Sequence, residues 1–156
     1  MRSLAVIGAA LLAASASGPS ASGQVTPTND TLCHPASNPY DAVTAAPYSH
    51  HVLLEDSHVR VLEILLPPSA IEPIHIHALP SVITGDTGGG EGAKFIYTSY
   101  KMVNGKFEVL ESETVTPDPG YRTVYTAPEG PHSIANIGTA AVRYLRMEIK
   151  PESCSK

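Results

Sequence analysis

From residue 51 onward, the chain is a succession of short β-branched and aromatic runs separated by turn residues. Runs of this kind at short spacing are typical of an antiparallel sandwich or barrel. No segment of this region predicts a convincing helix. Strands are expected at residues 52–55, 59–66, 74–77, 81–84, 94–103, 106–114, 122–126, 133–136 and 141–149. The pattern therefore predicts an all-β fold, and 156 residues leave room for one domain.

The strongest local signal in this pattern is the dipeptide Asn104-Gly105. A two-residue hairpin turn of the primed type needs positive φ at both central positions, and Asn-Gly tolerates that conformation. We therefore expect the strands at 94–103 and 106–114 to be antiparallel neighbours.

The first 23 residues have the layout of a secretory signal peptide, with Arg2, an apolar run over 4–14 and then small residues. The apolar run is too short to span a bilayer as a permanent anchor. A buried N-terminal helix is the alternative, and Gly8 with the Gly/Ser/Pro tail argues against it. We therefore exclude residues 1–23 from the fold and predict a secreted or periplasmic protein without a membrane anchor after cleavage.

Residues 24–47 contain four prolines and no apolar period, which predicts an irregular N-terminal arm. The barrel domain is then expected at 48–150 and a C-terminal tail at 151–156. Asn29 begins a glycosylation acceptor that matters only in a eukaryotic host. The formal net charge of −5 argues against nucleic acid or an anionic membrane surface as a partner.

Cys33 and Cys154, the two cysteines, lie near opposite ends of the expected mature chain. An oxidising compartment would let them pair, which would lower the entropy of the unfolded chain by about 4–5 kcal/mol in the chain-entropy model. Free or intermolecular thiols stay an alternative, because the sequence alone does not show that the sulfurs meet.

His75 and His77 are two residues apart in the run expected as a strand. Residues two apart on a strand point to the same side, so the two imidazoles project together while Ile74 and Ile76 project to the other face. Two neighbouring imidazoles form half of a metal site and need a further donor from elsewhere in the fold. The alternation does not tell which face is inside, so histidines that face water stay an alternative.

A third histidine, His132, follows a Pro/Gly turn and heads the strand expected at 133–136. This position predicts an imidazole at the mouth of a barrel. Taken alone, an ordinary rim histidine is the simpler interpretation.

Two segments resemble the two sequence motifs of the cupin superfamily. Residues 73–85 resemble the first motif, which has a His-x-His pair on one strand, then a glutamate and, after a turn, a glycine. Residues 120–136 resemble the second motif, with one residue fewer than usual between its last glycine and its histidine, and the matching positions are Pro128, Gly130, His132 and Asn136. The resemblance covers about residues 52–149 and implies a single-domain cupin-type antiparallel β-barrel, also called a double-stranded β-helix or jelly roll.

The chain departs from the first motif where the family has its glutamate ligand. Four and five residues after His77 stand Ser81 and Val82, and serine is a poor metal ligand unless it is ionised. Glu63 and Glu72 are other acidic candidates. The sequence does not show where their side chains lie, so they stay outside the predicted ligand set.

What the resemblance implies is a divalent metal ion (Fe, Mn, Zn or Ni) held by His75, His77 and His132, with open positions for a small-molecule substrate. The implied activity is that of an oxygenase or an isomerase-like enzyme. The missing glutamate motivates an alternative, a non-enzymatic cupin that binds a small ligand or has a structural role without metal. If the histidines face the interior, Ile74 and Ile76 face outward, so we expect a homodimer or coverage by the arm.

Overall fold

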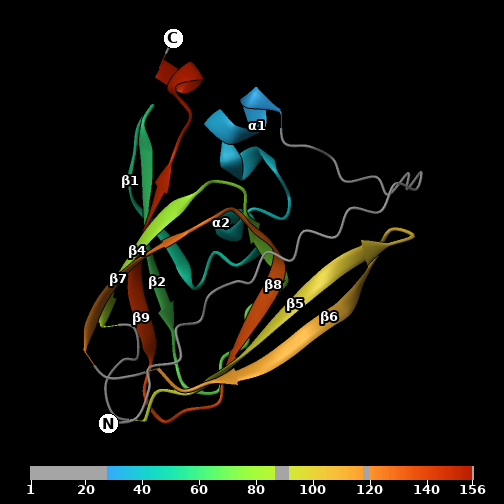
Figure 1. The fold of residues 1–156 in the computed structure, drawn as a ribbon, viewed down its shortest axis with the longest axis vertical. Helices are drawn as coiled ribbons and strands as arrows, with labels where there is room; N and C mark the ends of the chain where they lie inside the picture. Colours follow the sequence, from blue (N-terminus) through green and yellow to red (C-terminus); the bar gives the residue numbers. More distant parts are fainter. Residues whose placement is uncertain (1–27, 87–91, 118–119, 156) are drawn as a thin grey trace, which may run out of the picture.

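The computed structural model describes residues 28–86, 92–117 and 120–155, which form two antiparallel sheets in a sandwich (Figure 1). The strands are β1 (His50–Glu55), β2 (Val59–Leu66), β3 (His75–His77), β4 (Ser81–Asp86), β5 (Phe95–Val103), β6 (Lys106–Val115), β7 (Tyr121–Thr126), β8 (Glu129–Asn136) and β9 (Val142–Ile149). The five-stranded sheet has the order β1-β2-β9-β4-β7, and the four-stranded sheet has the order β3-β8-β5-β6. The predicted all-β fold is confirmed. The predicted signal peptide lies outside the described residues.

The strand β2 shows how the sequence pattern makes the interior of the sandwich. Its side chains alternate between buried and half-buried along its length, and it pairs with β9 from Val59 to Leu66. Leu62, Ile64 and Leu66, at every second position, turn one face of the strand toward the opposite sheet. One cluster of the apolar core is formed by the buried residues Leu66, Ile134 and Val142, against which Phe95 and Tyr144 pack.

The hairpin predicted at Asn104-Gly105 is confirmed. Asn104 has φ of 49° and Gly105 has φ of 76°, as a primed turn requires, and the flanking residues Val103 and Lys106 are paired. The strands β5 and β6 extend beyond the body of the sandwich toward this turn (Figure 1).

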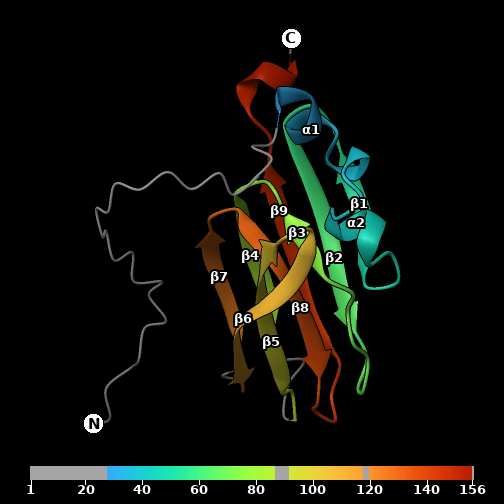
Figure 2. The same ribbon diagram turned by 90° about the vertical axis from the view of Figure 1, so that its right-hand side faces the viewer.

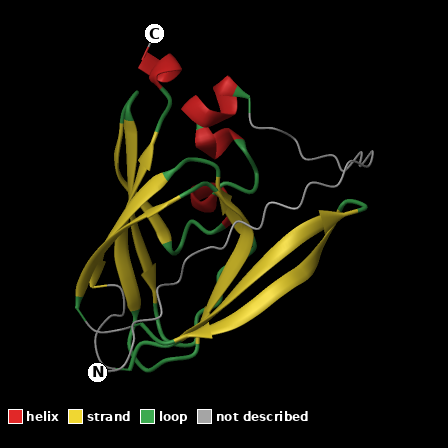
Figure 3. Cartoon of the chain, viewed as in Figure 1, coloured by secondary structure: helices red, strands yellow, loops and turns green. Residues whose placement is uncertain are grey.

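The arm has more regular structure than its composition indicated. It contains the short helices α1 (Asn29–Cys33) and α2 (Ala42–Ala45) and the 3-10 turn η1 (Pro35–Ser37), and a second 3-10 turn, η2, spans Glu152–Ser155. Figure 3 shows these helical turns in red and the strands in yellow. Each α-helix begins at a capping side chain that accepts a hydrogen bond from a backbone N–H, Thr28 for α1 and Asp41 for α2. No helix among the described residues is long and apolar enough to cross a membrane.

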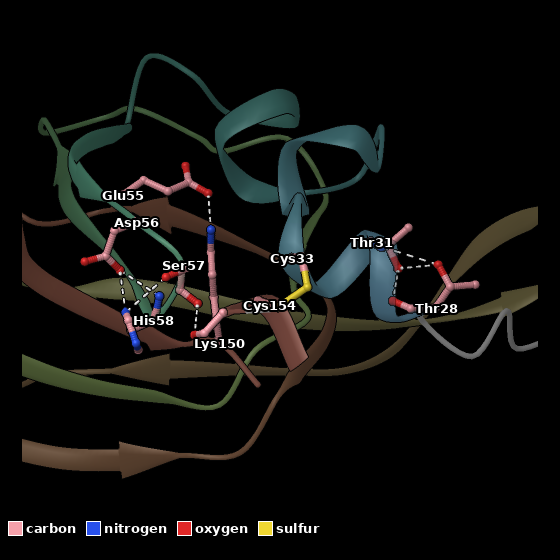
Figure 4. The surroundings of a disulfide bond; sticks show 10 residues. Thr28, Thr31, Cys33, Glu55, Asp56, Ser57, His58, Lys150 and Cys154 are labelled. Atoms are coloured by element: carbon pink, nitrogen blue, oxygen red, sulfur yellow. Dashed lines mark hydrogen bonds and ion pairs between the residues drawn. A yellow bond between two sulfur atoms is a disulfide. The ribbon is translucent and has the colours of Figure 1, made fainter. Parts of the chain in front are cut away.

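A disulfide bond joins Cys33 to Cys154 and so attaches the arm to the C-terminal tail (Figure 4). This confirms the pairing that the sequence left open. Beside it, the ammonium of Lys150 forms an ion pair of 2.7 Å with Glu55, which ties the end of the chain to β1.

The arm also pairs with the free edge of β3. The backbone N–H of Ile76 donates a 2.8 Å hydrogen bond to the carbonyl of Tyr40, and Asp41 forms a parallel bridge with Ile76. Figure 2 shows the arm, in blue and cyan, along one side of the sandwich. The arm therefore contacts β3 through the backbone of Ile76.

Candidate metal centre

Four buried histidines gather in the interior of the sandwich. Their exposed fractions are 1–3%, and they come from β1, β3 and β8: His50, His75, His77 and His132. Ring centroids lie 4.7 Å apart for His50 and His75, 5.3 Å for His75 and His77, and 4.4 Å for His75 and His132. The three histidines predicted from the sequence therefore lie together, and the His75 and His77 side of β3 is the inner one.

The cluster contains one histidine that the sequence reasoning missed. One donor atom each of His50, His75 and His77 lies within 4.8 Å of the other two, which is close enough for a shared ion. His132 is outside that closest group of three, but its ring packs against His75. His50 belongs to no motif, and its neighbour His51 is exposed, so the only local signal for it is its position in a strand.

His132 lies deeper than the barrel mouth at which it was expected. The strand β8 begins at Glu129 rather than near 133, because Glu129 and His132 pair with His77 and His75 of β3. The register shifts between these two pairs, so a β-bulge accommodates the Gly130-Pro131 step inside the strand.

Each of the four imidazoles is anchored through Nδ1. In every ring this nitrogen lies within hydrogen-bonding distance of an oxygen, and the contacts are 3.3 Å to Ala46 O for His50, 2.9 Å to Pro73 O for His75, 2.7 Å to Glu148 Oε1 for His77 and 2.9 Å to Gly130 O for His132. An imidazole that donates from Nδ1 has an unprotonated Nε2, which is the form that binds metals.

Burial keeps these imidazoles uncharged. It is the main cause that lowers the pKa of His50 to about 3 and the pKa of His75 to about 2, with further lowering by the neighbouring histidines and by Arg146. Burial also lowers the pKa of His77 and of His132. At neutral pH the four rings are therefore neutral and available as ligands.

Glu72 is a carboxylate in the same cluster. It is 2% exposed, and its oxygens lie 3.8 Å from His50 Nδ1 and 3.9 Å from His75 Nε2. Neither oxygen has a hydrogen-bond partner at normal distance among the described residues; burial raises the pKa of Glu72 to about 7, and the nearby hydroxyl of Ser49 offsets part of this rise. A buried carboxylate without hydrogen-bond donors is costly unless a cation accompanies it.

The other acidic positions considered from the sequence differ from Glu72. Glu63 forms a 2.6 Å ion pair with Arg143, a largely exposed side chain, and its histidine contact is the exposed His51 at 3.8 Å, outside the buried cluster. Ser81, at the position of the missing family glutamate, is buried and accepts a 3.0 Å hydrogen bond from Arg146 Nε.

A network of buried ionic contacts supports the ring of His77 through its Nδ1 atom. Arg60 donates to both oxygens of Asp41 at 2.9 and 2.7 Å and, through Nε, to Glu148 at 2.6 Å. The other oxygen of Glu148 accepts the hydrogen bond from His77. The ring orientation of His77 therefore depends on a network that begins in the arm, at the cap of α2.

The charges around the cluster fit a divalent cation. Among the described residues, the two guanidiniums of Arg60 and Arg146 are accompanied by four carboxylates, which are Asp41, Glu72, Glu129 and Glu148. With Glu72 ionised, the group carries an excess of two negative charges, which one divalent ion would balance. Imidazole nitrogens with one carboxylate suit Fe, Mn, Zn or Ni.

The chain matches no protein-family model and no curated protein. Similar solved structures include a cupin domain from Bordetella pertussis Tohama I, with 19% sequence identity, a TM-score of 0.49, and coverage of 65% of this chain and 92% of that chain. An RmlC-like cupin family protein with a double-stranded β-helix fold from Methanocaldococcus jannaschii has 15% identity and a TM-score of 0.44, and the match covers 65% of this chain and 78% of that chain. Both matches are similarities of structure at low sequence identity.

Proposed function

We propose that this chain binds one divalent metal ion (Fe, Mn, Zn or Ni) inside the sandwich and acts there on a small molecule, as an oxygenase or an isomerase-like enzyme. The observation that carries the proposal is the cluster of buried, neutral imidazoles anchored at Nδ1 around a carboxylate to which no described residue donates. The proposed ligands are His75, His77 and His132, as expected from the sequence, together with His50 and Glu72.

Glu72 supplies the negative charge of the family glutamate, whose position is occupied by Ser81 in this chain. It approaches the cluster from the segment that leads into β3, whereas the family position is on the strand after it. The loss of the motif glutamate therefore does not remove carboxylate from the site.

The chain's own residues hold the site and surround it with hydrogen-bonding groups. Bound metal would polarise substrate oxygens and stabilise negative charge on them. Glu148 holds His77 in the tautomer with a free Nε2. Tyr97 stacks on His132 with ring centroids 5.1 Å apart, and burial raises the pKa of its phenol, so Tyr97 keeps its proton and can donate a hydrogen bond to a ligand.

Metal analysis tests the proposal before any substrate is known. The protein, made in an oxidising compartment and purified without chelator, is expected to contain about one Fe, Mn, Zn or Ni ion per chain by plasma mass spectrometry. Chelation should lower its melting temperature, and the same ions should restore it. A folded, metal-free protein whose melting does not respond to these ions would instead favour the alternative, a cupin that binds a small ligand without metal.

The disulfide supports the proposed secreted or periplasmic location, because such bonds persist mainly in oxidising compartments. Fractionation of the producing cells with a thiol-labelling assay of Cys33 and Cys154 tests it. The protein is expected outside the cytoplasm with both thiols blocked.

The outer face of the five-stranded sheet supports a homodimer. One apolar row crosses all five strands through successive cross-strand partners, Leu54, Val61, Met147, Val82 and Tyr125. Leu54, Met147 and Tyr125 are 53%, 43% and 68% exposed. A second copy would cover this row, and light scattering of the wild type and Met147→Glu tests whether it does.

A further inference from the structure

Arg146 is a buried cation next to the proposed metal site that the proposed ligand set does not use. It lies on β9 and is 2% exposed. Its Nε donates to Ser81 and lies 3.8 Å from Glu148 Oε1, while Nη1 forms a 2.5 Å ion pair with Glu129. The Nη2 nitrogen donates to no described residue.

The guanidinium is therefore only partly used as a hydrogen-bond donor. Its planar fork can donate two parallel hydrogen bonds to one carboxylate, but Glu129 contacts Nη1 alone. A buried donor without an acceptor costs free energy, and an incoming carboxylate could accept from both nitrogens. Arg146 thus has unused capacity for one anionic group.

The position of Arg146 places such an anion beside the histidines. Glu148 contacts both Arg146 and His77, so a single carboxylate separates the guanidinium from a proposed ligand. The charge of Arg146 also contributes to lowering the pKa of His77 and of His132. An anionic group on the free side of Arg146 would lie near the proposed metal site.

Glu129 is the group that an incoming carboxylate would replace. Its side chain is 24% exposed, whereas Arg146 is buried, so Glu129 can turn to solvent without a large desolvation change. The exchange of one carboxylate for another keeps the number of charges around Arg146 the same. It therefore avoids the cost of an additional buried charge.

A pocket of about 680 Å³ reaches Glu129 and His77 from the side of the arm. Its lining is mainly apolar and includes Tyr40, Ile76 and Phe107. This volume lies within the range of roughly 300–1,000 Å³ that is usual for small-molecule sites. The pocket therefore offers room for an apolar body next to Glu129, the ion-pair partner of Arg146.

We propose that the small molecule bound by this protein is a carboxylic acid with an apolar body, whose carboxylate displaces Glu129 and pairs with Arg146. The apolar body occupies the pocket between the arm and the β5–β6 hairpin. This inference rests on the proposed function, whose substrate class it names.

The test uses 3-phenylpropionate as the probe and 3-phenylpropionamide as its neutral match, with calorimetry on the full, disulfide-bonded chain, both zinc-loaded and metal-free. The acid is expected to bind at least about tenfold more tightly than the amide. Arg146→Lys should weaken binding of the acid about tenfold or more, because lysine lacks the planar fork. Arg143→Lys, an exposed change on the same strand, is the matched control and should have no effect.

Glu129→Gln provides a result that misfolding cannot mimic. It removes the competing carboxylate, so the acid should bind about threefold to tenfold more tightly than to the wild type. Equal affinities for acid and amide, no binding of either, or no gain in Glu129→Gln would each overturn the inference. Metal content is measured on the same samples. A metal-loaded chain without preference for the acid contradicts only this inference, whereas preference for the acid in a chain that takes up no metal contradicts only the proposed metal function.

Discussion

The two ends of the sandwich interior have opposite chemistry, although the same strands build both. On β2, Leu66 lies in the apolar core and Arg60 in the ionic network, and both are about 1% exposed. On β9, Val142 likewise lies in the apolar core and Glu148 in the ionic network, and both are buried. Equal burial thus accompanies apolar packing at one end and paired or unpaired charge at the other.

This difference separates the residues that stabilise the fold from the residues of the proposed site. Full burial of an apolar side chain such as Leu66 contributes roughly 1.5–3 kcal/mol. Burial of charged groups costs free energy that ion pairing only partly offsets, and the carboxylate of Glu72 has no hydrogen-bond partner at normal distance among the described residues. The polar end therefore contributes less to stability than the apolar end, as the proposed metal site would require.

The largest effect is expected from removal of two imidazoles at the polar end. His75→Ala combined with His77→Ala should reduce bound metal from about one ion per chain to less than about a tenth, because the ion loses two neighbouring ligands. Plasma mass spectrometry and far-ultraviolet circular dichroism measure metal content and folding. His58→Ala, an exposed histidine, is the control and should keep its metal. If the folded double variant retained its metal, the polar end would not be the metal site.

At the apolar end the expected effect falls on stability alone. Leu66→Ala should lower the free energy of unfolding by about 3 kcal/mol, because it leaves a cavity in the core. Metal content per folded chain should stay unchanged. Urea unfolding measures the first and mass spectrometry the second, with the 65% exposed Leu110 changed to alanine as the control. A loss of metal in Leu66→Ala would show that the two ends are not independent.

Glu72→Gln should change stability and metal binding in opposite directions. The folded-state pKa of Glu72, about 7, is above its ordinary value of 4.5, so the metal-free protein loses stability as pH rises through this interval. Glutamine removes that loss and should stabilise the chelated protein at pH 8 by about 1–3 kcal/mol, while metal binds more weakly.

Unfolding of the chelated wild type and Glu72→Gln at pH 5 and pH 8 measures this difference. The control is Glu63→Gln, because Arg143 holds the pKa of Glu63 below its ordinary value. Parallel pH dependence in the wild type and Glu72→Gln would contradict the assignment of Glu72 as a buried, uncompensated carboxylate.

A smaller effect is expected from Glu148→Gln, which weakens the support of His77. Metal affinity should fall about tenfold, because the amide no longer offers a charged acceptor to Nδ1. Asp41→Asn should act in the same direction through Arg60 and by less. Metal titration monitored by calorimetry measures both, and unchanged affinity in Glu148→Gln would mean that the network serves only the fold.

Features that depend on neighbours in the chain could be predicted from the sequence. The alternation of β2, the turn at Asn104-Gly105 and the shared side of His75 and His77 all follow from strand geometry over a few residues. The start of β8 did not follow, because its first residues are held in the strand by pairing with β3 rather than by their own propensity. Gly130 and Pro131 locally indicate a turn, and cross-strand pairing overrides that preference.

An all-β chain, two motif-bearing segments and the three candidate ligands His75, His77 and His132 could be predicted from the amino-acid sequence, because period-two patterning and local turn chemistry depend on consecutive residues. That His50 and Glu72 join them, and that Arg146 lies alongside, is visible in the folded chain alone. These residues belong to separate strands and a connecting segment, and their meeting depends on long-range pairing and sheet packing. No local pattern encodes such contacts, since each residue taken alone is compatible with either face of its strand.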